Sequence, residues 1–448
     1  MKNLNVKQNG KHWIGIATIA AALVPGTLSA QQASDSLLQQ ATLENVIQYA
    51  LKHQPSVQNA LVNEQITETT IKGKLADWYP QVNFNYSYQH NFQLQTTVFQ
   101  GNPVKIGVDN TSSMQFTATQ AIFNRDVLLA ARSAGIVRQQ AKQNTASTKI
   151  DVAVNVSKAF YDVLATTQQI KVSKEDITRL ERSQQDAYNQ YKAGVTDKTD
   201  YKRAQIALNN TKALLRSNEE ALKAKLEYLK ALMGYPVNND LPIVYDTLQM
   251  EREIPVDTLQ QLNPATRIEY QQLVTQRRIQ EYNLMYNKWS FLPALSANGA
   301  YNLNYLNNSF SKLYGDNVPN SYAGVTLSLP LFQGGKRRYN IKQAEWQLKS
   351  IDLQITDLRN SVNAEYAQAL ATYKASLANF LSLKENLALA QEVYDVIQLQ
   401  YRSGVKTYLE VITSETDLRT ARINYFNALY QVLAGKIDVQ KSLGQINY

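Results

Sequence analysis

The sequence predicts a membrane protein of mixed α/β class, in which amphipathic strands and very long helices each occur twice along the chain. Three observations carry this prediction. Four segments alternate strictly between apolar and polar residues, which is typical of strands with two different environments on their faces. Two long stretches, 104–235 and 331–448, contain no proline. Motifs of the first half recur about 210 positions later, which indicates an internal duplication.

The N-terminus has the layout of a secretory signal peptide. Lys2, Lys7 and Lys11 precede an apolar stretch over residues 13–24, and small residues lead up to Ala30. A membrane anchor is the alternative, but this apolar stretch is shorter than the roughly 18 residues that a spanning helix needs. We therefore expect residues 1–30 to be a signal peptide and the rest to be exported.

Composition excludes several classes of function. The 448 residues contain no cysteine, so the chain has neither disulfides nor an acylated N-terminal cysteine. The net charge of +9 is scattered rather than clustered, which argues against a nucleic-acid partner. Beyond residue 30 only His53 and His90 remain as histidines, so we predict no enzyme, no metal site and no cofactor. Acidic pairs such as Asp176 and Glu181 are expected on solvated helix faces.

The first repeat, residues 31–234, is predicted to contain a helix, two strands near 82–94 and 114–122, a long helix, a tip turn near 194 and another helix. In the first strand, apolar residues from Val82 to Leu94 alternate with amides and hydroxyls. We interpret the apolar positions as facing lipid and the amides as facing a wet lumen. A soluble antiparallel sheet packed on a core would give the same alternation.

The second repeat, residues 264–448, has the same order. Its strands are expected near 295–305 and 323–331, and the sequence YRSGV around 404 matches YKAGV around 194. From 336 to 403 there is neither proline nor glycine, and apolar residues recur every three or four positions. This spacing predicts a coiled-coil helix of roughly 100 Å.

Four strands cannot close around a lumen, because the smallest membrane barrels have about eight. Open sheet edges are not tolerated in lipid, so the chain must associate with further copies. Two copies would give eight strands with a filled interior, and three would give twelve around a lumen.

Several motifs together resemble the TolC-like outer-membrane efflux family. They are TLENVIQYALKHQPSVQNA (42–60), LSLPLFQGG (327–335), a weaker AIFNRD (121–126), YRSGV followed by TYLEVITSETDL (401–418), and QKSLG (440–444). The resemblance implies a homotrimer in the outer membrane of a Gram-negative bacterium, whose twelve-stranded barrel continues into an α-helical barrel across the periplasm. It implies an export duct of a tripartite efflux or type I secretion system. Its partners would be a periplasmic adaptor (membrane fusion protein) and an inner-membrane RND, MFS or ABC transporter. Residues 235–263 would form an equatorial segment.

The resemblance also implies a gate at the periplasmic helix tips. Thr199 and Asp200 would face Tyr401 and Lys406, and an ion pair between Asp200 and Lys406 would latch the gate. Lysine makes a less directional pair than the arginine of the best-known family pattern. Glu410 matches an acidic pore ring, which would favour cations.

Two further expectations concern the tips. Thr407 and Glu410 also fit a capping box, a structural role that does not exclude the pore ring. Gly194 and Gly404 fit left-handed helix ends, and with Val195 and Val405 they would form the docking surface for the adaptor.

The rival interpretation of the whole chain is a secreted coiled-coil structural or adhesive protein. Such a protein would be extracted without detergent, whereas a membrane duct would not.

Overall fold

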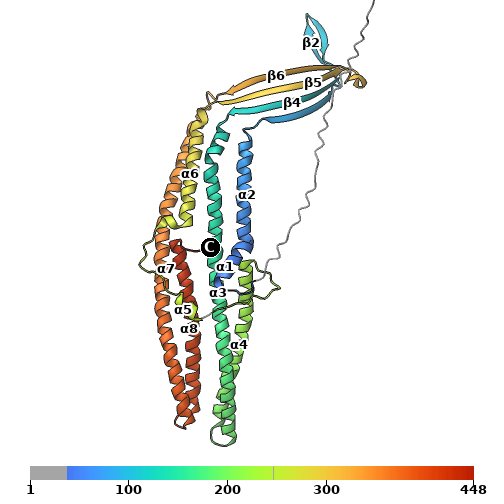
Figure 1. Ribbon diagram of the computed structural model, residues 1–448. Helices are drawn as coiled ribbons and strands as arrows, with labels where there is room; N and C mark the ends of the chain where they lie inside the picture. The colour runs from blue at the N-terminus through green and yellow to red at the C-terminus, as the bar shows by residue number, and fades with distance from the viewer. Residues whose placement is uncertain (1–37, 246) are drawn as a thin grey trace, which may run out of the picture. The chain divides into compact units, whose positions relative to one another are not determined.

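The computed structural model describes residues 38–245 and 247–448; the predicted signal peptide lies outside them. In this part of the chain a curved sheet lies at one end of a bundle of long helices (Figure 1). The first half comprises α1 (Leu43–His53), α2 (Pro55–Ala76), β1 (Gln81–His90), β2 (Gln95–Phe99), β3 (Asn102–Ile106), β4 (Asn110–Phe123), α3 (Arg125–Lys192) and α4 (Lys198–Met233). The second half comprises α5 (Thr247–Arg252), η1 (Pro264–Thr266), α6 (Ile268–Lys288), η2 (Trp289–Phe291), β5 (Ala294–Asn307), η3 (Phe310–Lys312), β6 (Asn317–Ser328), α7 (Lys336–Arg402) and α8 (Tyr408–Leu443).

The longest helices are α3 and α7, with 68 and 67 residues. At 1.5 Å per residue each extends over roughly 100 Å, and α7 ends one residue before the predicted boundary. Each is followed by a helix of 36 residues that runs back alongside it, so that α3–α4 and α7–α8 form two helical hairpins (Figure 1). Apolar residues spaced along α7, among them Ile351, Val362, Tyr373 and Phe380, are buried. In the described residues, no helix combines the length and the hydropathy that a membrane crossing requires.

The main sheet is antiparallel, in the order β1-β4-β5-β6. Its register brings most apolar positions of the four strands to one face and most amides and hydroxyls to the other. The apolar face includes Val82, Phe84 and Tyr86 of β1, Met114 and Phe116 of β4, Tyr301 and Leu303 of β5, and Val325 and Leu327 of β6. The polar face includes Asn83, Asn85 and Ser87, Gln115 and Thr117, Asn298 and Asn302, and Asn320 and Thr326.

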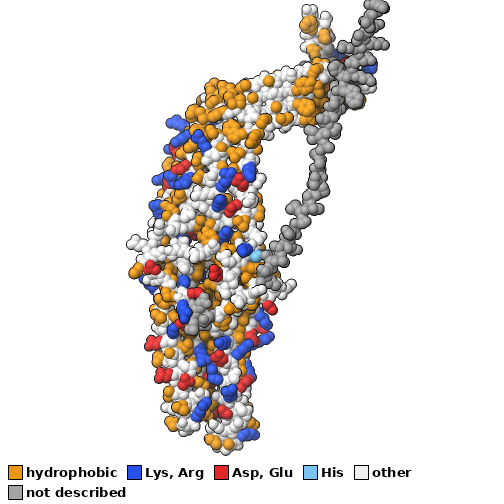
Figure 2. Space-filling view, viewed as in Figure 1, with side chains coloured by type: hydrophobic (Ala, Val, Ile, Leu, Met, Phe, Trp, Pro, Cys, Tyr) orange, Lys and Arg blue, Asp and Glu red, His pale blue; other side chains and the backbone are white. Residues whose placement is uncertain are grey.

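Neither face of this sheet carries a full charge. The four strands contain no Asp, Glu, Lys or Arg, and in Figure 2 most of the visible charged side chains lie over the helices. An uncharged polar face opposite an aromatic one is unlike an ordinary solvated sheet, in which lysine and glutamate are common on the wet side.

The first predicted strand, Val82 to Leu94, is too long. β1 ends at His90; the Asn91 amide still donates to the Asp109 carbonyl at 2.7 Å, and the chain then leaves the sheet. The predicted loop from Gln95 to Ser113 contains a second hairpin, β2–β3. Gln100 and Gly101 both have positive φ, 51° and 84°, as the tight turn of such a hairpin requires.

The other strands are also longer or displaced relative to the prediction. β4 begins four residues before 114 and β5 ends two residues after 305. β6 begins six residues before 323 and ends at Ser328 rather than 331. Pro319 is tolerated because β6 is an edge strand, and Pro330 cannot donate a ladder bond, which ends the pairing.

The segment that follows α4 is fixed to the middle of the bundle. The Tyr373 hydroxyl donates to the Ile254 carbonyl at 2.9 Å, and the Tyr366 hydroxyl to the Gln260 carbonyl at 2.8 Å. Both tyrosines belong to α7, so residues of the 235–263 segment pack against that helix. The division into repeats on either side of this segment stays a prediction.

Candidate functional site

The candidate site is the pair of helix tips at the end of the bundle opposite the sheet (Figure 1). Gly194 and Gly404 have φ of 70° and 74°, which confirms the predicted left-handed helix ends. The amides of the next residues, Val195 and Val405, each donate at 2.9 Å to a carbonyl in the last helical turn. The side chains of Val195 and Val405 are 73% and 70% exposed, so both tips present an apolar side chain to the outside.

Glu410 caps the helix that follows the second tip. Its carboxylate accepts from the Thr407 amide at 2.9 Å, the glutamate half of the predicted capping box. Lys406 donates to the other carboxylate oxygen at 2.6 Å. These bonds, with Lys406 as the main cause, lower the pKa of Glu410 to about 2. The capping role is therefore confirmed, and Glu410 remains negatively charged at neutral pH.

The first tip is capped differently. Asp197 precedes α4, and its carboxylate accepts from the Thr199 amide at 3.0 Å. This bond lowers the pKa of Asp197 from its usual range. Thr199 and Asp200 lie in the first turn of α4, where the negative charge of Asp200 interacts favourably with the positive helix end.

Tyrosines connect the two tips. The Tyr401 hydroxyl of α7 donates to the Gln190 side chain of α3 at 3.1 Å, and the rings of Tyr401 and Tyr408 have their centroids 5.9 Å apart. Tyr408 packs with Ala187 and Ala204 in a small buried cluster that joins both hairpins. Burial raises the pKa of Tyr408, and the negative charge of Asp200 adds to this shift.

The predicted ion pair between Asp200 and Lys406 does not form within the described chain. Lys406 lies two residues before α8 and instead binds Glu410, which stands in the first turn of that helix. The two residues are only four positions apart in the sequence, so they meet without any contribution from the other hairpin.

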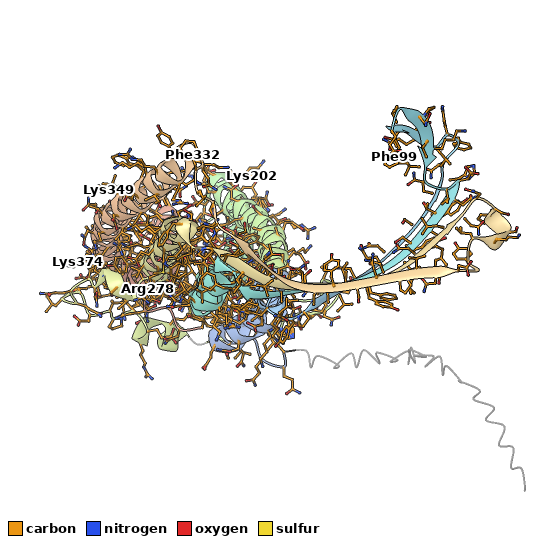
Figure 3. The ribbon with its side chains drawn as sticks, turned by 90° about the horizontal axis from the view of Figure 1, so that it is seen from above. Phe99, Lys202, Arg278, Phe332, Lys349 and Lys374 are labelled. Atoms are coloured by element: carbon orange, nitrogen blue, oxygen red, sulfur yellow. The ribbon has the colours of Figure 1, made fainter. Side chains whose placement is uncertain are left out.

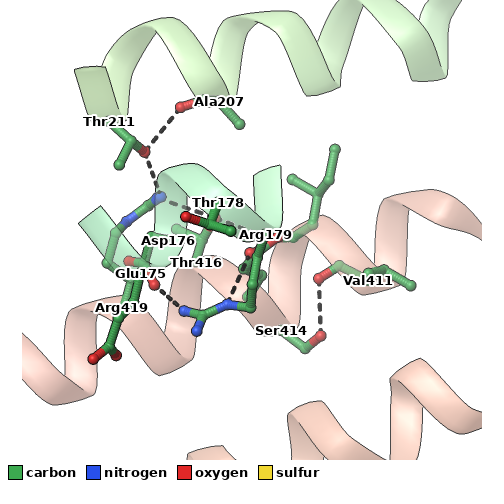
Figure 4. A network of polar contacts seen from close by, with 12 residues as sticks. Glu175, Asp176, Thr178, Arg179, Ala207, Thr211, Val411, Ser414, Thr416 and Arg419 are labelled. Atoms are coloured by element: carbon green, nitrogen blue, oxygen red, sulfur yellow. Dashed lines mark hydrogen bonds and ion pairs between the residues drawn. The ribbon is translucent and has the colours of Figure 1, made fainter. Parts of the chain in front are cut away.

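A buried polar network lies between the hairpins, above the tips (Figure 4). Arg179 of α3 bonds Asp176 on the same helix, and its Nε lies 3.5 Å from Oε1 of Glu415 on α8. Arg419 of α8 donates to the Thr211 hydroxyl of α4 at 2.9 Å. The side chains of Asp176 and Glu415 are 0% and 2% exposed. The network therefore ties α8 to both helices of the other hairpin.

The network corrects one expectation from the sequence. Asp176 was expected on a solvated face with Glu181, but Asp176 is buried and only Glu181 is exposed, where it pairs with Lys212 at 2.8 Å. Burial raises the pKa of Glu415, and the positive charges of Arg179 and Arg419 only partly oppose this. In the sequence, the spacing of three residues indicates that Asp176 and Arg179 can pair on one helix face. The burial of Asp176 depends on α8, which the spacing does not reveal.

The two histidines after the signal peptide have structural contacts. The His53 ring stacks on Tyr49 with centroids 4.0 Å apart, and His90 Nδ1 lies 2.8 Å from the Asn110 side-chain oxygen. Across 38–245 and 247–448, no group of three His, Cys, Asp or Glu residues is placed to hold a metal ion.

Comparison with known proteins gives consistent results. The family model described as "Outer membrane efflux protein" matches residues 46–235 and 269–445. The chain is 21% identical over 430 residues to the outer membrane protein TolC of Escherichia coli (strain K12), covering 92% of this chain and 84% of that protein.

Solved structures share the fold. The outer membrane protein VceC of Vibrio cholerae is similar with a TM-score of 0.71 at 14% identity, over 90% of this chain and 96% of that one. The open-state MtrE outer membrane channel of Neisseria gonorrhoeae has a TM-score of 0.70 at 17% identity, over 90% and 88%. With the charge-free two-faced sheet and the paired helical hairpins, these matches show that the chain belongs to the outer membrane efflux protein family.

Proposed function

We propose that this protein is the outer-membrane export duct of a tripartite efflux or type I secretion system, assembled as a homotrimer. The observation that carries the proposal is the four-stranded sheet with one aromatic, apolar face and one uncharged polar face. Lipid would cover the apolar face, and water and passing substrates would contact the amides. The family membership supports the outer-membrane location.

The free edges of the sheet support the stoichiometry. β1 and β6 are the outermost strands, and their unpaired backbone groups would be very unfavourable in lipid. Pairing β6 of one copy with β1 of the next satisfies both edges. Two copies would leave an interior filled by side chains, whereas three give twelve strands around an open lumen, which a duct requires.

The helical hairpins would continue this lumen across the periplasm. The exposed turns at Gly194 and Val195 and at Gly404 and Val405 are the proposed docking surface for a periplasmic adaptor. The adaptor would connect the duct to an inner-membrane RND, MFS or ABC transporter. Conduction through the duct is passive, because the energy is supplied by that transporter.

The gate is proposed at the tips, where Thr199, Asp200, Tyr401, Lys406 and Glu410 would line the constriction. A latch between Asp200 and Lys406 would require Lys406 to release Glu410. The buried network of Asp176, Arg179, Glu415 and Arg419 would hold the two hairpins of each chain together above the constriction. Opening would then require the hairpins to separate at this network or to move together as one unit.

The test is the detergent-corrected mass of protein purified from membranes, followed by conductance in planar bilayers. A mass of three chains and a defined conductance would support the duct. A secreted coiled-coil structural or adhesive protein would be extractable without detergent and would not conduct. A soluble monomer would mean that the sheet packs on its own core, which would overturn the proposal.

A further inference from the structure

A cavity of about 470 Å³ lies where the sheet meets the helices. Its wall combines the first turns of α3 and α7, the end of α6 and the adjoining ends of β5 and β6. Among its residues are the cations Arg125, Lys336 and Arg337, and the carboxylate of Asp126. The cavity is therefore basic, and it is built by parts of the chain far apart in the sequence.

The acid in the cavity is already compensated. Asp126 lies 3.8 Å from Arg125, whose guanidinium also stacks over the Tyr286 ring at 4.5 Å. Within the described ranges, neither Lys336 nor Arg337 has an ion-pair partner. Arg337 donates one bond, to the Pro330 carbonyl at 3.1 Å. Two positive charges are therefore available to a ligand.

Two polar atoms in the cavity wall lack partners although they are out of contact with solvent. They are Nε of Arg337 and Oγ of Ser290. Both atoms lie behind the surface of the wall, and each retains an unused hydrogen-bonding capacity. The N-terminus of α7 also favours a negatively charged ligand, because the helix dipole is positive there. Its N-cap, Gly335, has no side chain that could accept hydrogen bonds from the first amides of the helix.

The residues just before α7 connect the cavity with a lipid boundary. Leu331 and Phe332 are 88% and 89% exposed, and three residues separate Phe332 from the basic run Lys336, Arg337 and Arg338. Exposed apolar side chains beside basic ones are typical of a membrane interface, where the former enter the acyl region and the latter bind headgroups. This placement rests on the proposed function, whereas the affinity of the cavity for an anion does not.

We propose that the cavity binds a phosphate group, with Lys336 and Arg337 as the charged donors. A phosphate offers several acceptor oxygens, which matches a guanidinium and an ammonium on residues that line the same cavity. The phosphodiester of a membrane phospholipid and free inorganic phosphate share this chemistry.

The experiment uses the full-length protein, purified in detergent and stripped of bound lipid. Native mass spectrometry follows the binding of dioleoylphosphatidylglycerol and of dioleoylglycerol, which has the same acyl chains without a phosphate. Calorimetry with inorganic phosphate tests the free anion. Binding of the phospholipid but of neither other probe assigns a headgroup, and binding of inorganic phosphate assigns a free-anion site.

The variants Lys336→Gln and Arg337→Gln are expected to weaken phosphate-dependent binding about tenfold, the loss of one charge-assisted hydrogen bond. Lys336→Gln is the safer variant, because Arg337→Gln also removes the bond to Pro330. The control is Lys349→Gln, an exposed lysine roughly 20 Å farther along α7. Figure 3 labels Phe332 and Lys349 at the edge of the helical bundle.

The proposal is overturned if dioleoylglycerol binds as well as the phospholipid, or if both variants bind like Lys349→Gln. It is also overturned if none of the three probes binds. Conductance measured on the same preparations separates the two proposals: a conducting protein without phosphate binding disproves the site alone, and a non-conducting protein that binds phosphate disproves the duct alone.

Discussion

At the residue scale, a single glycine allows the end of α4 to approach the end of α1. Gly234 has a φ of 67°, and a Cβ placed there would lie 2.6 Å from the His53 carbonyl oxygen. Gly234→Ala should destabilise the protein by more than about 1 kcal/mol, because alanine is strained in a left-handed backbone conformation and its Cβ would clash with the His53 carbonyl. Gly135→Ala is the control, because it lies inside α3 with no atom within 4 Å of a new Cβ, and it should be neutral or stabilising by up to about 1 kcal/mol. Thermal unfolding followed by circular dichroism compares them; equal loss in both would contradict the argument.

Glu410 allows a second prediction at this scale, on ion selectivity. If three copies of Glu410 form a pore ring, Glu410→Gln should reduce the cation preference of the channel, measured as a shift in reversal potential under a salt gradient. The pKa of Glu410 is lowered to about 2, so its charge is present above that value and is lost only as the pH falls through it. The cation preference of the wild type should therefore not change between pH 7 and pH 4. Glu64→Gln, a carboxylate on α2 far from the tips, is the matched control. A selectivity unaltered by Glu410→Gln would leave Glu410 with its capping role alone.

At the element scale, the contact between α3 and α8 depends on a buried carboxylate. Burial raises the pKa of Glu415 in the folded protein above its pKa in the unfolded chain. The protonated carboxyl therefore favours folding. This contribution to stability is fully present below the unfolded pKa and is lost as the pH rises through the folded pKa. On lowering the pH from 7 to 5, the unfolding temperature of the wild type should therefore rise relative to that of Glu415→Gln. Glu181→Gln removes an exposed pair instead and should change stability by less than about 1 kcal/mol at either pH. A constant difference between the wild type and Glu415→Gln would mean that Glu415 is not proton-linked in this range.

At the scale of the whole molecule, the absence of cysteine makes cross-linking of the sheet edges simple. A double variant Ser87→Cys, Asn320→Cys places one thiol on each edge strand, on the polar face. If the sheet closes as a ring of three, oxidation should give products of at most three chains, seen on denaturing gels. The control Thr117→Cys, Ala300→Cys joins facing positions of β4 and β5 inside one chain and should stay monomeric. A ladder that continues beyond three chains would contradict ring closure by a trimer.

The sequence alone determined most of the architecture, because the relevant signals are local. Alternation with a period of two predicts strands, and the sheet register confirms which positions share a face. The absence of proline and glycine predicted α7 to within one residue, and Gly194 and Gly404 marked both tips. These features depend on the steric limits of the backbone within a few residues, so the local sequence is enough to predict them.

Only the tertiary structure decided which side chains meet. Asp176 looks like any polar residue on a helix, and it is buried because Glu415 and Arg419, more than two hundred positions later, pack against its helix. Charges on long helices can pair in many ways, and the packing of distant hairpins selects one of them by fixing distance and excluding water.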